Sequence, residues 1–170
     1  EQTGATRGVR AVRARAAAVH QALDAAPPSA AWPADTPGME RLARYVTACT
    51  KPDDRVLALG YMPELFFLAG RRFAAGNVWI QPKFFDTPAD QQLMVDRVVR
   101  ERAPIAITVP EPEYTTEYVT SFPTLTGLLR TAYVDAGTID FGRGFRFRVL
   151  TRRDRPATRT YELDRLPCFS

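Results

Sequence analysis

The stretch "DDRVLALGYMPELFFLAGRR", residues 53–72, decides the class of fold. Its first half is a short apolar run that ends at Gly60, and such a run is typical of a strand covered on both faces. Its second half begins with Pro63 and ends at Gly70, as a short helix does. A buried strand that leads directly into a helix predicts an α/β fold, in which ligands bind beyond the carboxyl ends of the strands.

The alternation of helix and strand continues on both sides of this stretch. Further helices are predicted at residues 39–49, 87–104 and 120–133. Further strands are predicted at 77–81, 105–110, 133–137, 145–153 and 158–164. Consecutive β-α-β units predict a parallel sheet, and the closely spaced strands at the end predict antiparallel pairing. We therefore expect a Rossmann-like three-layer sandwich whose mostly parallel sheet ends in antiparallel strands.

The pattern divides the chain into an N-terminal helix with a Pro/Ala-rich linker, residues 1–37, and an α/β domain, residues 38–170. The helix is interpreted either as packed on the domain or as a basic segment beside a membrane. The first residue is Glu1 rather than Met, which indicates a fragment of a longer protein.

Composition excludes several classes of function. The 23 basic residues are scattered among 19 acidic ones, and the arginine pairs in "RRFAAGN" and "RRDR" are not interleaved with aromatics, so no nucleic-acid partner is expected. His20 is the only histidine and no Cys-x-x-Cys occurs, so no metal site is expected. Cys49 and Cys168 are interpreted either as a disulfide, which would suit an oxidising compartment, or as two unpaired thiols.

The turn after the first strand is unsuited to phosphate. A dinucleotide fingerprint needs three spaced glycines there, whereas this chain offers Gly60 alone. Pro63 removes a backbone donor, and Glu64 places a carboxylate at the helix N-terminus where a phosphate would bind. No nucleotide and no other cofactor is therefore expected. Glu64 either stabilises the helix end or accepts hydrogen bonds from a sugar hydroxyl.

The segment "PEPEYTTEY", residues 110–118, is an acidic stretch directly after the third strand of the parallel sheet. Carboxylates beside aromatic rings are typical of sugar-binding surfaces, because hydroxyls need acceptors and the sugar ring needs an apolar platform. The alternative is a solvated loop whose tyrosines pack on the sheet edge. The candidate ligand-binding residues at the mouth of the crevice are Tyr61, Met62, Glu64, Lys83, Glu111, Glu113 and Tyr114. No catalytic residue is assigned.

Three segments together carry a resemblance to a known family. They are "YVTACTKPDDRVLALGYMPELFFLAGRRFA" (45–74), "DQQLMVDRVVRERAPIAITV" (90–109) and "SFPTLTGLLRTAYVDAG" (121–137). From about Arg41 to Arg152, the chain resembles the soluble C-terminal domain of bacterial polytopic membrane glycosyltransferases of the protein mannosyltransferase-like, lipid-phosphate-sugar-dependent class. The most distinctive part of the likeness is "PELFFLAGRR".

The resemblance implies a non-catalytic domain outside the cytoplasm, because the catalytic acids of that class lie in loops of the membrane-embedded part. The implied partners are that membrane-embedded part and a glycan or protein acceptor. The arginines at 7, 10, 13 and 15 favour the cytoplasmic side instead, although long C-terminal domains weaken this rule.

Two other functions stay open. One is a structural or interaction module without a ligand, in which Tyr61, Phe84 and Phe85 would fill the crevice. The other is a small carboxylate-dependent hydrolase. It would need two of Glu64, Glu111, Glu113 and Glu117 about 5–9.5 Å apart across a cavity.

Overall fold

The computed structural model describes residues 9–25, 37–108, 113–142 and 145–170. The chain divides into two compact units, residues 1–34 and 35–170. The first unit contains helix α1 (Val9–Ala25), which lies within the helix predicted from the sequence. None of the described helices combines the length and the apolar character needed to cross a membrane.

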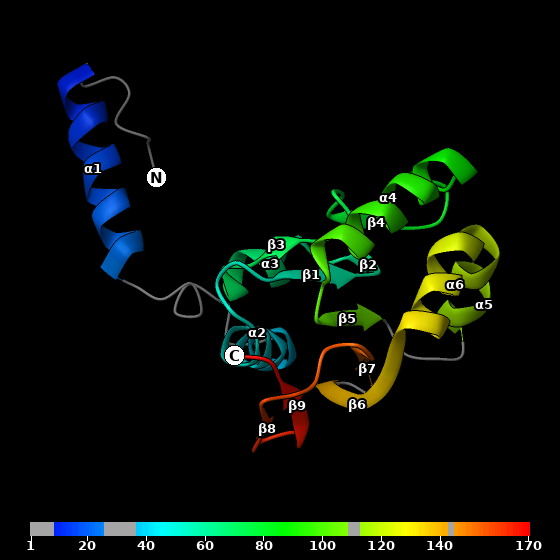
Figure 1. The fold of residues 1–170 in the computed structure, drawn as a ribbon. Helices are drawn as coiled ribbons and strands as arrows, with labels where there is room; N and C mark the ends of the chain where they lie inside the picture. The colour runs from blue at the N-terminus through cyan, green and yellow to red at the C-terminus, as the bar shows by residue number, and fades with distance from the viewer. Residues whose placement is uncertain (1–8, 26–36, 109–112, 143–144) are drawn as a thin grey trace. The chain divides into compact units, whose positions relative to one another are not determined.

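The second unit holds all the other described elements (Figure 1). Its helices are α2 (Pro37–Cys49), α3 (Pro63–Ala69), α4 (Pro88–Glu101), α5 (Glu113–Ser121) and α6 (Pro123–Ala132). Its strands are β1 (Arg55–Ala58), β2 (Gly60–Tyr61), β3 (Arg72–Phe73), β4 (Trp79–Ile80), β5 (Ile105–Thr108), β6 (Tyr133–Gly142), β7 (Phe145–Arg152), β8 (Arg159–Tyr161) and β9 (Leu166–Cys168).

Five of the described strands form one mixed sheet in the order β3-β1-β5-β7-β6. Strand β1 pairs in parallel with both β3 and β5. Strand β7 pairs antiparallel with both β5 and β6. The predicted α/β class and the antiparallel C-terminal end of the sheet are therefore confirmed.

The prediction was wrong about the second strand of the sheet. Residues 77–81 were expected in the parallel sheet, but β4 pairs antiparallel with β2 in a separate two-stranded ribbon. The position next to β1 is taken by β3, which follows α3 almost at once. The reason is the helix end: Gly70 adopts a left-handed conformation, φ 58°, which suits glycine and ends α3. Arg72 and Phe73 then run beside β1.

The solvated loop considered as one alternative for the acidic segment is not what the structure has, since Glu113–Ser121 is helix α5. Two buried aromatic residues at helical spacing explain the difference. Tyr118 and Phe122 stack with ring centroids 5.7 Å apart, and the Tyr118 hydroxyl donates to the carbonyl of Ile80 at 2.9 Å. Burial of these rings on β4 favours the helix over the solvated loop.

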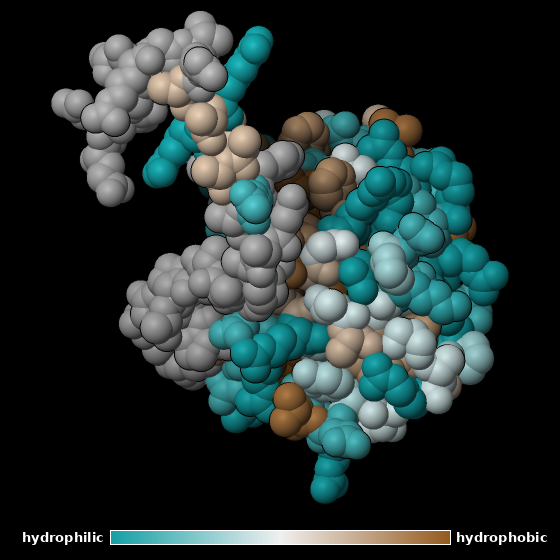
Figure 2. Space-filling view, turned by 90° about the vertical axis from the view of Figure 1, so that its left-hand side faces the viewer, coloured by the Kyte–Doolittle hydropathy of each residue, from teal (hydrophilic) through white to brown (hydrophobic). Residues whose placement is uncertain are grey.

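The core has two sides because neighbouring strand residues point to opposite faces. Leu57 lies beside Ala106, and Ala106 beside Leu150, so these three share one face. They belong to a buried cluster that includes side chains of α4, α5 and α6. The next residues in register, Ile107 and Val149, are fully buried on the other face. On the face shown in Figure 2, hydrophilic residues cover much of the described surface and hydrophobic ones lie in small groups.

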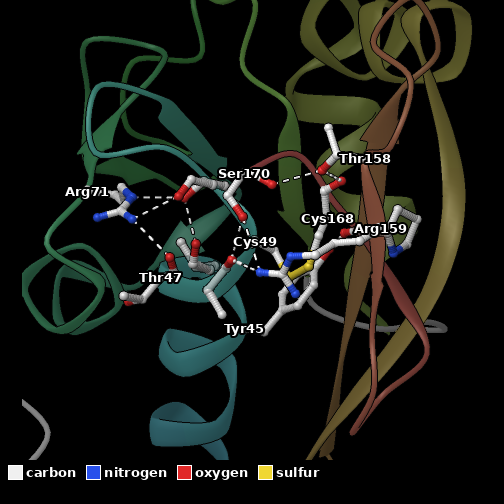
Figure 3. Close-up of a disulfide and its surroundings, with 12 residues drawn as sticks. Tyr45, Thr47, Cys49, Arg71, Thr158, Arg159, Cys168 and Ser170 are labelled. Atoms are coloured by element: carbon white, nitrogen blue, oxygen red, sulfur yellow. Dashed lines mark hydrogen bonds between the residues drawn. A yellow bond between two sulfur atoms is a disulfide. The ribbon is translucent and has the colours of Figure 1, made fainter.

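The C-terminal segment is fastened to α2. Cys49 and Cys168 are joined by a disulfide, and the backbone N–H of Phe169 donates to the carbonyl of Cys49 at 2.8 Å (Figure 3). The hydroxyl of Tyr45 donates to the carbonyl of Pro167, also at 2.8 Å. Ser170 donates its hydroxyl to the carbonyl of Ala48 at 2.7 Å. The last residues of the chain thus close against the first helix of the same unit.

Arg71, the arginine directly after the glycine in "LAGRR", connects the ends of two helices. Its Nε donates to the Thr50 hydroxyl at 2.8 Å, and its two terminal nitrogens donate to backbone carbonyls at the ends of two helices (Figure 3). Those carbonyls belong to Thr47 and Thr50 near the end of α2, at 3.0 and 2.9 Å, and to Ala69 of α3, at 3.1 Å. One guanidinium therefore satisfies the carbonyl ends of α2 and α3 together.

Candidate functional site

An exposed group of aromatic side chains lies just beyond the carboxyl end of β1. It consists of Tyr61, Trp79, Phe84 and Phe85, which we call the aromatic ribbon surface because it is built on the β2–β4 ribbon. Trp79 contacts Tyr61 edge to face at 5.3 Å between ring centroids, and it stacks on Phe84 at 4.4 Å. Tyr61, Phe84 and Phe85 are 59%, 44% and 52% exposed. Tyr61 and Phe84 are thus held at the surface through the half-buried Trp79, and the three exposed rings do not form a buried plug.

The turn that carries the two phenylalanines has an uncommon backbone. Lys83 and Phe85 both have positive φ, 74° and 57°, a region that costs a side-chain-bearing residue about 1–2 kcal/mol. Two hydrogen bonds hold the turn: the N–H of Lys83 donates to the Asp86 carboxylate at 2.8 Å, and the N–H of Phe84 donates to the Gln81 carbonyl at 3.0 Å. A strained backbone that is held in place by several hydrogen bonds is typical of binding and catalytic sites.

A buried glutamine fixes this turn to the helices behind it. Gln91 is 2% exposed, and its amide nitrogen donates to the carbonyls of Asp86 and Ser121 at 2.7 and 2.9 Å. Its amide oxygen accepts from the N–H of Thr124 at 3.0 Å. The turn, the end of α5 and the start of α6 are therefore joined by one side chain. The surface is preorganised, and binding a ligand there would cost little ordering of the backbone.

Polar residues lie near the ring-bearing residues in the sequence. Glu64 is exposed in the first turn of α3, immediately after β2, and Lys83 is exposed in the turn. The indole N–H of Trp79 donates to the side-chain oxygen of Gln81 at 2.6 Å, so that donor is already used. An apolar platform flanked by a carboxylate and an ammonium group suits a ligand with both C–H faces and hydroxyl groups.

The structure brings together only part of the predicted site. Tyr61, Glu64 and Lys83 are exposed, and Tyr61 reaches the turn of Lys83 through Trp79 and Phe84. Met62, in contrast, is 3% exposed and belongs to the core, because it is the residue that leads the chain into α3. Glu111 lies outside the described residues. Glu113 and Tyr114 open α5, but their side chains also lie outside the described part.

Sequence reasoning did not assign Trp79 to the site, and it considered Phe84 and Phe85 only as filling for the crevice. A signal for them was present. In "NVWIQPKFFD", residues 77–86, strand alternation places Trp79 and Gln81 on the same face, opposite Ile80. Two consecutive phenylalanines directly after a Pro-Lys turn are then too many apolar residues for an ordinary surface turn.

The described residues bear on the metal and hydrolase arrangements considered from the sequence. They include no group of three or more His, Cys, Asp or Glu side chains placed to hold a metal ion. Of the four carboxylates considered for a hydrolase, Glu64 and Glu117 are the two with described side chains, and both are exposed.

Comparison with known proteins gives no relative: no family model, no curated protein and no solved structure matches the chain.

Proposed function

We propose that this chain is a non-catalytic domain of a bacterial membrane glycosyltransferase-like protein, and that its aromatic ribbon surface binds a glycan acceptor. The single observation that carries the glycan part is the preorganised contact of Trp79 with the two exposed rings of Tyr61 and Phe84, together with the exposed Glu64 three residues after Tyr61. Aromatic faces bind the C–H face of a sugar ring, and a carboxylate accepts from its hydroxyls. The parentage rests on the resemblance of residues 41–152 to the domain of that class.

The fold and the disulfide support the same proposal. We infer a Rossmann-like three-layer arrangement, in which α4, α5 and α6 cover one face of the sheet and α2 and α3 cover the other. The Cys49–Cys168 disulfide is the bonding expected of a domain in an oxidising compartment, which supports a location outside the cytoplasm. The membrane-embedded part of the parent protein would then be its first partner.

The test is a titration of the isotopically labelled full chain with disaccharides, mannobiose and cellobiose, followed by chemical-shift changes in NMR spectra. Shifts should centre on the turn at 81–86 and on Tyr61, and Tyr61→Ala should weaken binding at least about fivefold, as expected for about 1 kcal/mol of ring contact. Phe67→Ala is the matched control: Phe67 is 63% exposed and has no aromatic ring contact among the described residues. It should bind like the unmodified chain.

Shifts confined to other parts of the chain, or equal losses in the two variants, would contradict the glycan proposal. If neither disaccharide shifts any signal, the alternative is favoured, a ligand-free interaction module. Its exposed rings would then contact a protein partner, such as the membrane-embedded part of its own parent chain. Released monosaccharide during the titration would instead indicate a hydrolase.

A further inference from the structure

A second surface feature lies at the opposite end of the sheet from the aromatic ribbon surface. It is an open pocket of about 320 Å³ at the end of β7, where Thr151 pairs with Ile105, the first residue of β5. Its lining residues are Val134, Thr151, Arg152, Arg153, Arg155, Ala157, Pro167 and Phe169. This volume is at the lower end of the range for small-molecule sites.

The lining of this pocket is strongly basic. Three of its residues are arginines, and no carboxylate lines it. The carboxylates that pair with these arginines, Asp54 and Asp154, lie outside the lining. The remaining walls are largely apolar, from Val134, Pro167 and the buried ring of Phe169. A concave surface lined by cationic side chains and apolar walls has an increased positive potential at its centre.

Two of the arginines are held in fixed positions. Arg155 donates to both carboxylate oxygens of Asp54, at 2.8 and 3.0 Å, and its guanidinium lies 5.8 Å from the ring centroid of Phe169. The side chain of Arg152 lies on the other face of the sheet from Val134 and Thr151: it donates to Asp154 at 2.7 Å and to the Val98 carbonyl of α4 at 3.4 Å, and its guanidinium lies 6.0 Å from the ring of Tyr133. A guanidinium has five N–H donors, so Arg155 keeps donors for a ligand after these bonds. Fixed donors lose little entropy on binding.

The third arginine is free to close on a ligand. Arg153 is exposed, and among the described residues its side chain has no hydrogen bond or ion pair. Its backbone N–H donates to the carbonyl of Ala132 at 2.9 Å, so the main chain at this position is fixed while the side chain can move. An unpaired cation between two paired ones leaves the pocket with an excess of positive charge.

We propose that this pocket binds a phosphate monoester that carries a small apolar group. A tetrahedral phosphate dianion can accept from several guanidinium groups at once, whereas a planar carboxylate is satisfied by a single arginine fork. The apolar group would contact Phe169 and Pro167. This site is independent of the glycan proposal, since it uses other residues at the other end of the sheet.

The experiment is an NMR titration of the full chain with phenyl phosphate, at low ionic strength, for the unmodified chain and two variants. Arg153→Gln removes the free cation. The matched control is Arg146→Gln, an exposed arginine near the start of β7, about 20 Å along the chain from Arg153, which directly follows that strand. A parallel co-sedimentation with vesicles, with and without phosphatidic acid, distinguishes a lipid headgroup from a free phosphate monoester as the source.

We expect saturable shifts at residues 151–155 and 167–169, and binding at least about tenfold weaker for Arg153→Gln, with little change for Arg146→Gln. Binding only to vesicles that contain phosphatidic acid, with the same ranking of the variants, supports the pocket with a lipid as the source. The proposal is overturned if neither probe binds, if the shifts lie elsewhere, or if both variants lose affinity equally.

Discussion

The disulfide between Cys49 and Cys168 gives the largest single perturbation that can be worked out from the structure. The two cysteines are 119 residues apart in sequence, so the bond closes a loop that covers most of the α/β unit. In the chain-entropy account, cross-linking a loop of this length raises the free energy of the unfolded chain by about 5 kcal/mol. We therefore expect Cys49→Ala/Cys168→Ala to lower the free energy of unfolding by up to about 5 kcal/mol, or the Tm by about 15–20 °C.

The assay is urea denaturation of the oxidised full chain and of the double variant, followed by far-UV circular dichroism. Tyr45→Phe is the control, since it removes only the hydroxyl bond to Pro167 between the same two segments and should cost about 1 kcal/mol. Alkylation of the unfolded chain without reductant, followed by mass spectrometry, verifies that the unmodified protein carries the disulfide. A loss below about 1.5 kcal/mol in a protein so verified would refute the reasoning from loop length.

Three further predictions follow from side chains at helix ends and in the core. Arg71→Ala should lower the free energy of unfolding by about 2–3 kcal/mol in urea denaturation. Arg71→Lys should recover less than half of this loss, because lysine has no planar fork of donors. Full recovery of the loss by lysine would contradict this account. Thr87 accepts from the N–H of Asp90 at 3.2 Å as the N-cap of α4, so Thr87→Ala should cost about 1 kcal/mol by the same measurement, and Thr87→Ser almost nothing. Burial raises the pKa of Tyr133 to about 12, above about 10 in an unfolded chain, so the folded state holds this proton more tightly. The contribution of this proton to stability is complete below about pH 10 and is lost as the pH rises to about 12. Tyrosinate absorbance and denaturation measured across this range should show the loss of stability, and the loss should be smaller in Tyr133→Phe.

Much of the α/β unit can be predicted from local patterns in the sequence. The apolar run at Val56–Leu59 and the capping residues Thr87 and Pro88 each act within a few residues, so they predict β1 and the start of α4 correctly. Strand pairing is a different matter. Residues 77–81 have the sequence of a strand and do contain one, β4. Which strand pairs with β4 depends on where Gly70 turns the chain, and strand propensity carries no information on that turn.

The candidate site was predicted only in part for the same reason. Tyr61, Glu64 and Lys83 could be placed at the strand ends, because in an α/β sheet those ends come together. The contact of Trp79 with both Tyr61 and Phe84 depends on the β2–β4 ribbon, and Met62 is buried because α3 turns it inward. The arginine pocket is lined by residues of β6, of β7 and of the segment that follows β7. One of its arginines, Arg155, bonds to Asp54, which directly precedes β1. No local spacing in the sequence indicates that these segments meet.

The disulfide has a practical consequence for anyone who handles this protein. Because it links the first helix of the α/β unit to its last residues, a protease that cuts the backbone once anywhere between residues 50 and 167 cannot release either piece. Such a nicked molecule would migrate as one band on a non-reducing gel and separate into two only after reduction.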